Sequence, residues 1–387
     1  MGNQTPSYPY LFKIVCFYLV LQFGMTLSQG PKCPFSYLYH FGDGFTDIGN
    51  CIHVVPKLKI PPGGWPYGKT FPGYPTGRWS DGRVDFDFTA VDFGLPDIVP
   101  YLGMNKSAAA SHQGVIFSTG GSPVLDLTFF LRRNIVIPPY ALSLKQQLVL
   151  FREHLDYVCS SPAECSKWIG ESMVLMGDIE GNDIGYALTQ GKSIQEVRSY
   201  VPAIVKTLID VSREVIKLGA TRVIIPGNIP VGCYPYILTE LQTRDRNAYD
   251  EIGCLKSVND LIVWKNGLLN ASVEDLKKEY PNVLILYSTM YEGPFGNSAL
   301  KSCCGIGGKY NYDSRRFCGN WGVPVCSNPS DYLFWDGRHF TDESNYEIEQ
   351  RMIAPALELF NCTPLSAGFS RRTRDNIVQV VDFLSSM

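Results

Sequence analysis

Four short runs of apolar residues along the chain predict buried β-strands. The runs are YLYHF at 37–41, SMVLMGD at 172–178, TRVIIPG at 221–227 and NVLILYS at 282–288. Each run is nearly continuous rather than alternating, which is typical of strands that are covered on both faces of a parallel sheet. We therefore expect a central parallel sheet.

Helical patterns lie between these runs and after them. Apolar residues recur every three or four positions over 193–219, and this segment ends at a glycine, as helices commonly do. Residues 342–360 show a similar pattern. Alternation of strands and helices implies right-handed crossovers, so we predict an α/β fold, a three-layer α/β/α sandwich with a parallel central sheet. No internal repeat or long linker divides the chain, and one domain is expected over 29–365.

The two ends of the chain are expected to be appendages to this domain. Lys13 precedes the apolar run IVCFYLVLQFGM, and TLSQG offers small residues for cleavage near Ser28 or Gly30. Residues 1–28 are therefore predicted to be a secretory signal peptide, with a retained signal anchor as the alternative. No later segment reaches about 18 apolar residues, so no membrane contact is expected after signal removal. The polar, basic tail at 366–387 is expected to be frayed, with a sorting signal as the alternative.

Twelve cysteines fit passage through an oxidising compartment, and we expect an extracellular or vacuolar protein. Loss of Cys16 with the signal leaves an odd number, which implies at least one free thiol or an intermolecular bridge. The short spacings Cys159–Cys165 and Cys318–Cys326 suggest local loop disulfides, although the sequence leaves the pairing open. Three sequons predict glycosylation of at least one asparagine among Asn105, Asn270 and Asn361.

The charge and the cysteine spacings argue against other classes of partner. A net charge of −3 gives no electrostatic basis for binding nucleic acid. No paired C-x-x-C or Cys/His spacing typical of a zinc site occurs, so neither a metal nor another cofactor is expected. The sequence does not decide the oligomeric state.

Acidic, glycine-containing segments follow two of the predicted strands. In open parallel sheets, ligands bind at the carboxyl ends of the strands. GDG at 42–44 and GDIEGND at 177–183 lie at such positions. Near the other end of the chain, DGRH places Asp336 three residues before His339. On a turn this spacing brings the carboxylate close enough to fix the tautomer of the imidazole.

Seven blocks of the sequence, in the same order, are similar to blocks of the plant GDSL esterases, which belong to the SGNH-hydrolase class. They are FGDGFTDIGN, YPTGRWSDGRV, GVIFSTGGS, GDIEGND, IPVGC, CCGIGG and YLFWDGRHFT. The resemblance covers nearly all of the chain after the signal. It implies acyl transfer from small-molecule esters through a serine. Within the family, CPFSYLYHFGD and YNYDSRRFCGNWGVPVC resemble the acetylajmalan-type esterases, which remove an acetyl group in indole-alkaloid biosynthesis.

The resemblance assigns roles to single residues. Asp336 and His339 correspond to the pair that activates the family's serine. The family's oxyanion hole has three donors, which correspond to the Gly44 N–H, the Gly121 N–H and the side-chain amide of Asn182. Gly120 is the alternative to Gly121. Each such donor typically contributes roughly 3–4 kcal/mol to acyl transfer.

Position 44 departs from the family, which has Gly-Asp-Ser where this chain has Gly-Asp-Gly at 42–44. Glycine has no hydroxyl, so no acyl-enzyme can form there. In another serine hydrolase, loss of the nucleophile lowers the rate about a million-fold. Thr46, Ser118 and Ser122 carry hydroxyls nearby in the predicted loops, but none has an evident route to His339.

Three functions are compatible with this pattern. The first is an esterase relative with absent or very weak serine-esterase activity, whose ligand is a small-molecule ester or alkaloid-like compound. The second is a repurposed enzyme in which His339 and Asp336 act as a base on a carbonyl compound or on a water molecule. The third is a binding protein without catalysis.

Two substitutions and one loop leave their roles open. Cys51 and Glu180 occupy positions where many family members have asparagine and glycine. Glu180 either places a carboxylate near the site or is a solvent-facing turn residue. The long loop at 61–83 carries aromatic residues that either stack on a ring-rich ligand or pack the loop itself. These residues are Trp65, Tyr67, Phe71, Tyr74 and Trp79.

Overall fold

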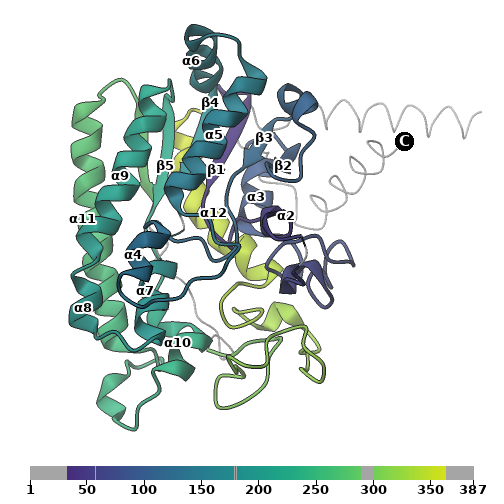
Figure 1. Ribbon diagram of the computed structural model, residues 1–387, viewed down its shortest axis with the longest axis vertical. Coiled ribbons are helices and arrows are strands. Elements are labelled where there is room, and N and C mark those ends of the chain that lie inside the picture. The colour runs from purple at the N-terminus through teal and green to yellow at the C-terminus, as the bar shows by residue number, and fades with distance from the viewer. Residues whose placement is uncertain (1–32, 57, 178, 180, 289–299, 363–387) are drawn as a thin grey trace, which may run out of the picture.

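Six parallel strands form one central sheet in the computed structural model (Figure 1), which describes residues 33–56, 58–177, 179, 181–288 and 300–362. The signal peptide and the tail predicted from the sequence lie outside these residues. The strands, in their order across the sheet, are β2 (Ile98–Pro100), β3 (Gly114–Ile116), β1 (Tyr37–Phe41), β4 (Ser172–Met176), β5 (Arg222–Pro226) and β6 (Leu284–Ser288). The predicted α/β fold with a parallel sheet is confirmed, and so are all four predicted strands. The sequence analysis missed β2 and β3, because three residues are too few to show a period.

Helices cover both faces of the sheet. In Figure 1, α5 (Leu144–Val158) and α9 (Val201–Lys217) lie in front of the sheet, and α12 (Asp342–Leu359) lies behind it. The helix α11 (Lys256–Glu279) packs against α9, and α3 (Asp85–Asp92) packs against α12. The remaining helices are α2 (Asn50–Val54), α4 (Leu127–Leu131), α6 (Pro162–Gly170), α7 (Gly181–Thr189), α8 (Ile194–Arg198) and α10 (Pro235–Glu240). None of the helices in the described ranges is long and apolar enough to cross a membrane.

The predicted helices fit the structure with one correction. The prediction over 342–360 is confirmed by α12. The segment 193–219 forms two helices, α8 and α9, rather than one. The break falls just before Pro202, which occupies the first turn of α9. Proline has no N–H with which to continue the hydrogen bonding of a preceding helix, so a new helix begins there.

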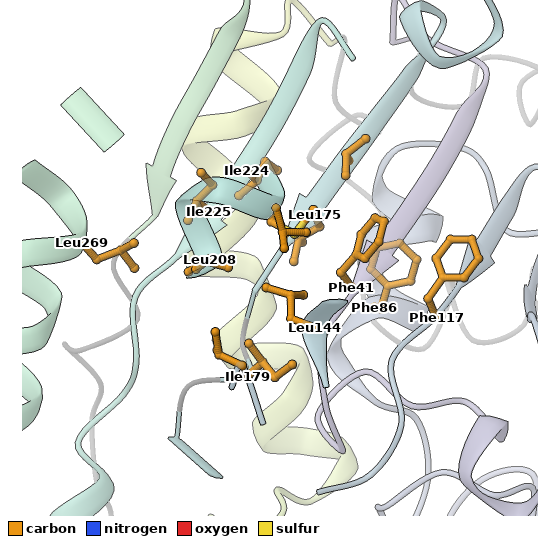
Figure 2. Packing of buried hydrophobic residues seen from close by; sticks show 14 of the residues in the cluster. Phe41, Phe86, Phe117, Leu144, Leu175, Ile179, Leu208, Ile224, Ile225 and Leu269 are labelled. Carbon is orange, nitrogen blue, oxygen red and sulfur yellow. The ribbon is translucent and has the colours of Figure 1, made fainter. Parts of the chain in front are cut away.

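Apolar side chains from the sheet and from the helices meet in a continuous core. Figure 2 shows Phe41 of β1 beside Phe117, with 5.3 Å between the ring centroids, and it also shows Leu175 of β4 and Leu144 of α5. All four side chains are fully buried. Burial of one such side chain stabilises the fold by about 1.5–3 kcal/mol. The continuous apolar runs of the strands are therefore explained by burial on both faces.

The order of the strands fixes where a ligand can bind. β1 pairs in parallel with β3 on one side and with β4 on the other. His40 lies opposite both Ile116 and Leu175, so the three strands end at nearly the same level. The chain leaves β1 toward one edge of the sheet and later crosses to the other side, which makes β1 a topological switch point. The loops that follow β1, β3 and β4 therefore converge.

Five disulfides link residues of the described part of the chain. The pairs are Cys33–Cys362, Cys159–Cys165, Cys233–Cys254, Cys303–Cys326 and Cys304–Cys318. The expected Cys159–Cys165 bridge is confirmed, whereas the suggested Cys318–Cys326 bridge is wrong. Cys303 and Cys304 are adjacent in the chain, and each bonds a different partner. Cys51 remains a free, buried thiol.

One polar residue is buried in the middle of β1 without hydrogen bonds. The side chain of His40 is fully buried, and in the described part of the chain neither ring nitrogen has a partner. Its ring meets the ring of Phe86 edge-on, with 4.6 Å between the centroids. Burial disfavours the charged imidazolium and lowers the pKa of His40 from 6.5 to about 3.

We predict that His40 makes the protein sensitive to acid. Its pKa is lower in the folded chain than in the unfolded chain, so only the unfolded chain takes up a proton below pH 6.5. The stability contributed by neutral His40 is complete above pH 6.5 and is lost as the pH falls toward 3. Urea denaturation should give a free energy of unfolding that falls less steeply in His40→Leu, by about 1.4 kcal/mol per pH unit between roughly pH 6 and 4.

The control is His53→Gln, since His53 is exposed. This variant should keep the pH dependence of the wild type. Equal slopes for His40→Leu and His53→Gln would show that His40 does not carry the acid sensitivity.

Candidate active site

The loop after β1 is held in place by hydrogen bonds to its backbone groups. Gln147 of α5 accepts a hydrogen bond from the Gly42 N–H at 3.0 Å and donates one to the Gly42 carbonyl at 2.8 Å. The Asp43 carboxylate accepts from the Phe45 N–H at 3.0 Å, which closes a turn around Gly44. Gly44 is buried in this turn, and its N–H has no acceptor among the described residues.

Asp47 joins this loop to the loop that follows β3. Its carboxylate accepts from the N–H groups of Gly49, Asn50 and Cys51 within its own loop. It also accepts from the Gly120 N–H at 2.8 Å across the strand ends. Because this bond uses the Gly120 N–H, that group is not available as an oxyanion donor.

Gly121 is the donor that this arrangement leaves available. In the ranges that the structure covers, no acceptor is found for the Gly121 N–H. Its φ of +73° is a left-handed conformation that glycine adopts without strain, and a Cβ there would lie 2.7 Å from the Tyr186 hydroxyl oxygen. That hydroxyl donates to the Gly121 carbonyl at 2.6 Å and holds the peptide in place. The geometry therefore favours Gly121 over Gly120.

Asn182 lies at the start of α7, where it bridges the two loops. Its amide donates one short hydrogen bond to the Asp43 carboxylate and another to the Ser122 carbonyl at 3.1 Å. These two bonds use both hydrogens of the amide. An oxyanion would have to displace one of them, so Asn182 acts in this conformation as a bridge rather than as a free donor.

Asp336 and His339 lie side by side in the turn before α12. The imidazole Nδ1 lies 2.8 Å from one carboxylate oxygen of Asp336 and 3.1 Å from the other. The carboxylate also accepts from the N–H groups of Arg338 and His339 and from the Tyr67 hydroxyl at 2.8 Å. Burial would raise the pKa of Asp336, but the charge and the hydrogen bond of His339 outweigh this effect and lower it. The sequence analysis missed Tyr67 as a partner of this carboxylate.

The other ring nitrogen of His339 faces Gly44. A Cβ built at position 44 would lie only 2.4 Å from His339 Nε2. The ring of Trp79 stacks on the imidazole with 4.7 Å between the centroids, and its Cδ1 lies 3.5 Å from the same Cβ position. Nε2 has no hydrogen-bond partner among the described residues. The imidazole therefore occupies space that a side chain at position 44 would need.

The other hydroxyls and the thiol near the site do not replace a serine at position 44. Thr46 donates to the Asp43 carbonyl, and Ser122 shares a hydrogen bond with Thr119. Ser118 is fully buried, and none of these hydroxyls is hydrogen-bonded to His339 within the described ranges. Burial and the neighbouring Asp47 carboxylate raise the pKa of Cys51 well above its ordinary value, so its thiol stays protonated. Glu180 lies outside the described residues.

The aromatic residues of the loop at 61–83 divide into two groups. Tyr67 and Trp79 are buried and contact the Asp336–His339 pair. Trp65 and Tyr74 are 60% and 62% exposed, so they do not pack the loop. Phe71 lies beside the Arg83 guanidinium, 4.8 Å from the centroid of its ring. The loop thus supports the site with one part and presents exposed rings with the other.

The three asparagines of the sequons lie at the surface. Asn105, Asn270 and Asn361 are all exposed. Asn105 begins a short 3₁₀ helix (Lys106–Ser111), Asn270 lies on α11, and Asn361 follows α12. Glycosylation at these positions stays a prediction.

Comparison with known proteins identifies the class to which this fold and this site correspond. The profile of the family described as GDSL-like Lipase/Acylhydrolase matches residues 38–351. The chain belongs to this family, as the sequence analysis predicted.

Individual relatives cover most of the chain. Acetylajmalan esterase 2 of Rauvolfia serpentina is 41% identical over 343 residues, which cover 86% of this chain and 93% of that protein. Sinapine esterase of Brassica napus is 37% identical over 358 residues, with coverage of 88% and 92%. The crystal structure of phospholipase A1 from Streptomyces albidoflavus NA297 matches with a TM-score of 0.33 and 12% identity, over 84% of this chain and 98% of that chain.

We predict that removal of the Tyr67 hydroxyl destabilises the fold at neutral pH. Tyr67→Phe deletes a hydrogen bond to a buried, ionised carboxylate, and such bonds contribute about 1.5–3 kcal/mol. Chemical denaturation at pH 7 should show a loss in this range. Tyr310→Phe is the matched control, because Tyr310 is equally buried but its hydroxyl has no hydrogen bond in the described part of the chain. A similar loss in both variants would contradict a specific role for the Tyr67–Asp336 bond.

Proposed function

We propose that this chain is a GDSL-family protein with absent or very weak serine-esterase activity, which binds a small-molecule ester or alkaloid-like ligand beside Gly44 and His339. The observation that carries the proposal is the glycine at position 44, opposite Nε2 of the histidine. A serine esterase needs a hydroxyl there to form the acyl-enzyme. No neighbouring hydroxyl is hydrogen-bonded to His339 in the described residues.

The relatives support the choice of ligand class. Proteins named acetylajmalan esterase match this chain at 38–41% identity over most of its length. The name of these proteins describes an acetyl ester as their substrate. Acetyl esters, including acetylated indole alkaloids, are therefore the compounds that we propose for the first tests. Five disulfides and three exposed sequons support a place in the secretory pathway, with an extracellular or vacuolar destination.

A second candidate function is base-catalysed chemistry on a carbonyl compound. The Asp336 carboxylate fixes the imidazole through Nδ1, which leaves Nε2 as the proton acceptor. From a water molecule bound next to it, Nε2 would take a proton as the oxygen attacks the carbonyl carbon. The N–H groups of Gly44 and Gly121 would stabilise the charge that develops on the carbonyl oxygen. The third possibility is a binding protein that uses the same groups without turnover.

Replacing glycine 44 with serine tests the proposal. We expect the wild type to be inert toward acetyl esters and Gly44→Ser to gain activity of at least about a hundred-fold over it. The full effect of a serine nucleophile is about a million-fold. The gain should be smaller because Nε2 must first move back by about 1 Å to reach an ordinary contact distance from a new Cβ. The measurement is the rate of acetate release from 4-nitrophenyl acetate and from acetylated indole alkaloids.

Two further variants separate the outcomes. Gly44→Ala displaces the imidazole without supplying a nucleophile, and Gly44→Ser with His339→Ala supplies the nucleophile without its base. Both should be inactive. Wild-type turnover equal to that of Gly44→Ser would contradict the loss of serine-esterase activity. Wild-type turnover that disappears in His339→Ala would instead favour the base-catalysed reaction.

A further inference from the structure

Arg338 carries a half-buried positive charge next to the Asp336–His339 pair. Arginine stays protonated in proteins, so the charge is permanent. Gly337, with a φ of +87°, forms the turn that separates Arg338 from Asp336. Within the described ranges, no carboxylate forms an ion pair with this guanidinium. From Arg338, the Asp336 carboxylate accepts a hydrogen bond of the backbone N–H alone, and its other hydrogen bonds are with His339 and Tyr67.

Tyrosine side chains replace a counter-ion around the guanidinium. Nε and Nη2 of Arg338 donate to the Tyr312 hydroxyl at 3.3 and 3.1 Å. The guanidinium carbon lies 4.1 Å from the centroid of the Tyr236 ring, at a distance typical of a cation–π contact. Burial raises the pKa of Tyr186, and the positive charge of Arg338 opposes that rise, so the guanidinium also interacts electrostatically with this phenol. Tyr186 is the residue that holds the Gly121 carbonyl.

The hydrogen-bonding capacity of this group is only partly used. A guanidinium has five N–H donors. The bonds to Tyr312 use the Nε–H and one Nη2–H, and no acceptor among the described residues is found for the Nη1 hydrogens. The Tyr312 oxygen accepts both of these bonds, so its own hydrogen is directed elsewhere and is available to donate. The planar set of guanidinium N–H donors, or fork, and the neighbouring phenol hydroxyl can donate hydrogen bonds to the two oxygens of a carboxylate.

We propose that Arg338 and the Tyr312 hydroxyl form a subsite for a carboxylate group of the ligand, beside the imidazole of His339. The ligand class is then an ester or other carbonyl compound that also carries a carboxylate. A protonated amine is disfavoured at this position, because it would lie next to a like charge in a partly desolvated environment. This inference rests on the proposed function, since it assumes that the ligand lies beside the Asp336–His339 pair.

The test compares two probes that differ only in charge. Phenylacetate carries a carboxylate, and phenylacetamide is its neutral analogue of nearly the same shape. Isothermal titration and ligand-observed NMR on the full protein with glycine at position 44 should show that phenylacetate binds at least ten-fold more tightly. In Arg338→Met this preference should disappear, with the affinity for phenylacetamide unchanged within about two-fold. Arg338→Lys, which keeps a positive charge but not the fork, should retain part of the preference.

Controls and outcomes keep the inference separate from the proposed function. Arg315→Gln removes an exposed arginine from the same part of the chain and should bind both probes as the wild type does. Thermal unfolding of Arg338→Met checks that the fold is intact; if it is not, the partial loss of the preference in Arg338→Lys tests the subsite instead. If phenylacetate binds no more tightly than phenylacetamide, or if Arg338→Met keeps the preference, the carboxylate subsite is wrong. Both measurements record binding rather than turnover. A failure of the carboxylate subsite therefore does not affect the proposal on Gly44, which the esterase assay tests.

Discussion

The parallel pairing of β1 with both β3 and β4 is the constraint on which the site depends. This pairing brings three strand ends to one level and makes their loops converge. Residues that are far apart in sequence, such as Gly44, Gly121 and Asn182, then belong to one region of the molecule. Long apolar runs on the central strands supply the burial that keeps this register fixed, because a shift would expose the core.

Buried carboxylates hold the converging loops in a defined geometry. The Asp47 carboxylate accepts hydrogen bonds from N–H groups of its own loop and from the Gly120 N–H. Asp183 does the same for the backbone N–H groups of Val124 and Leu125. Peptide N–H groups that would otherwise be buried without partners are satisfied in this way. The same bonds decide which N–H groups stay available, and among the described residues those of Gly44 and Gly121 have no acceptor.

The glycine at position 44 supplies no hydroxyl, while the side chains around it are still held in place. The Asp336 carboxylate still orients His339, and Trp79 still supports its ring. The imidazole nevertheless fills the space in which a larger residue would stand. A histidine oriented by Asp336 and two backbone N–H groups without acceptors among the described residues remain, near a permanent positive charge at Arg338. Charge and donors of this kind recognise a polar ligand whether or not a nucleophile is present.

The sequence by itself determined the fold class and the proximity of Asp336 to His339. Both rest on local patterns. Apolar runs mark the central strands, and the three-residue spacing in DGRH places Asp336 beside His339. The family followed from ordered blocks that are also contiguous in sequence.

Only the tertiary structure decided the features that depend on distant partners. Tyr67 lies 269 positions from Asp336, and no local pattern links the two. The choice between Gly120 and Gly121 followed from a hydrogen bond to Asp47, and the pairing of Cys318 with Cys304 followed from the path of a loop. The position of Nε2 against Gly44 depends on the packing of Trp79. Hydrophobic periodicity records which face of an element is buried, whereas the partner that each polar group finds is set by where the folded chain brings it.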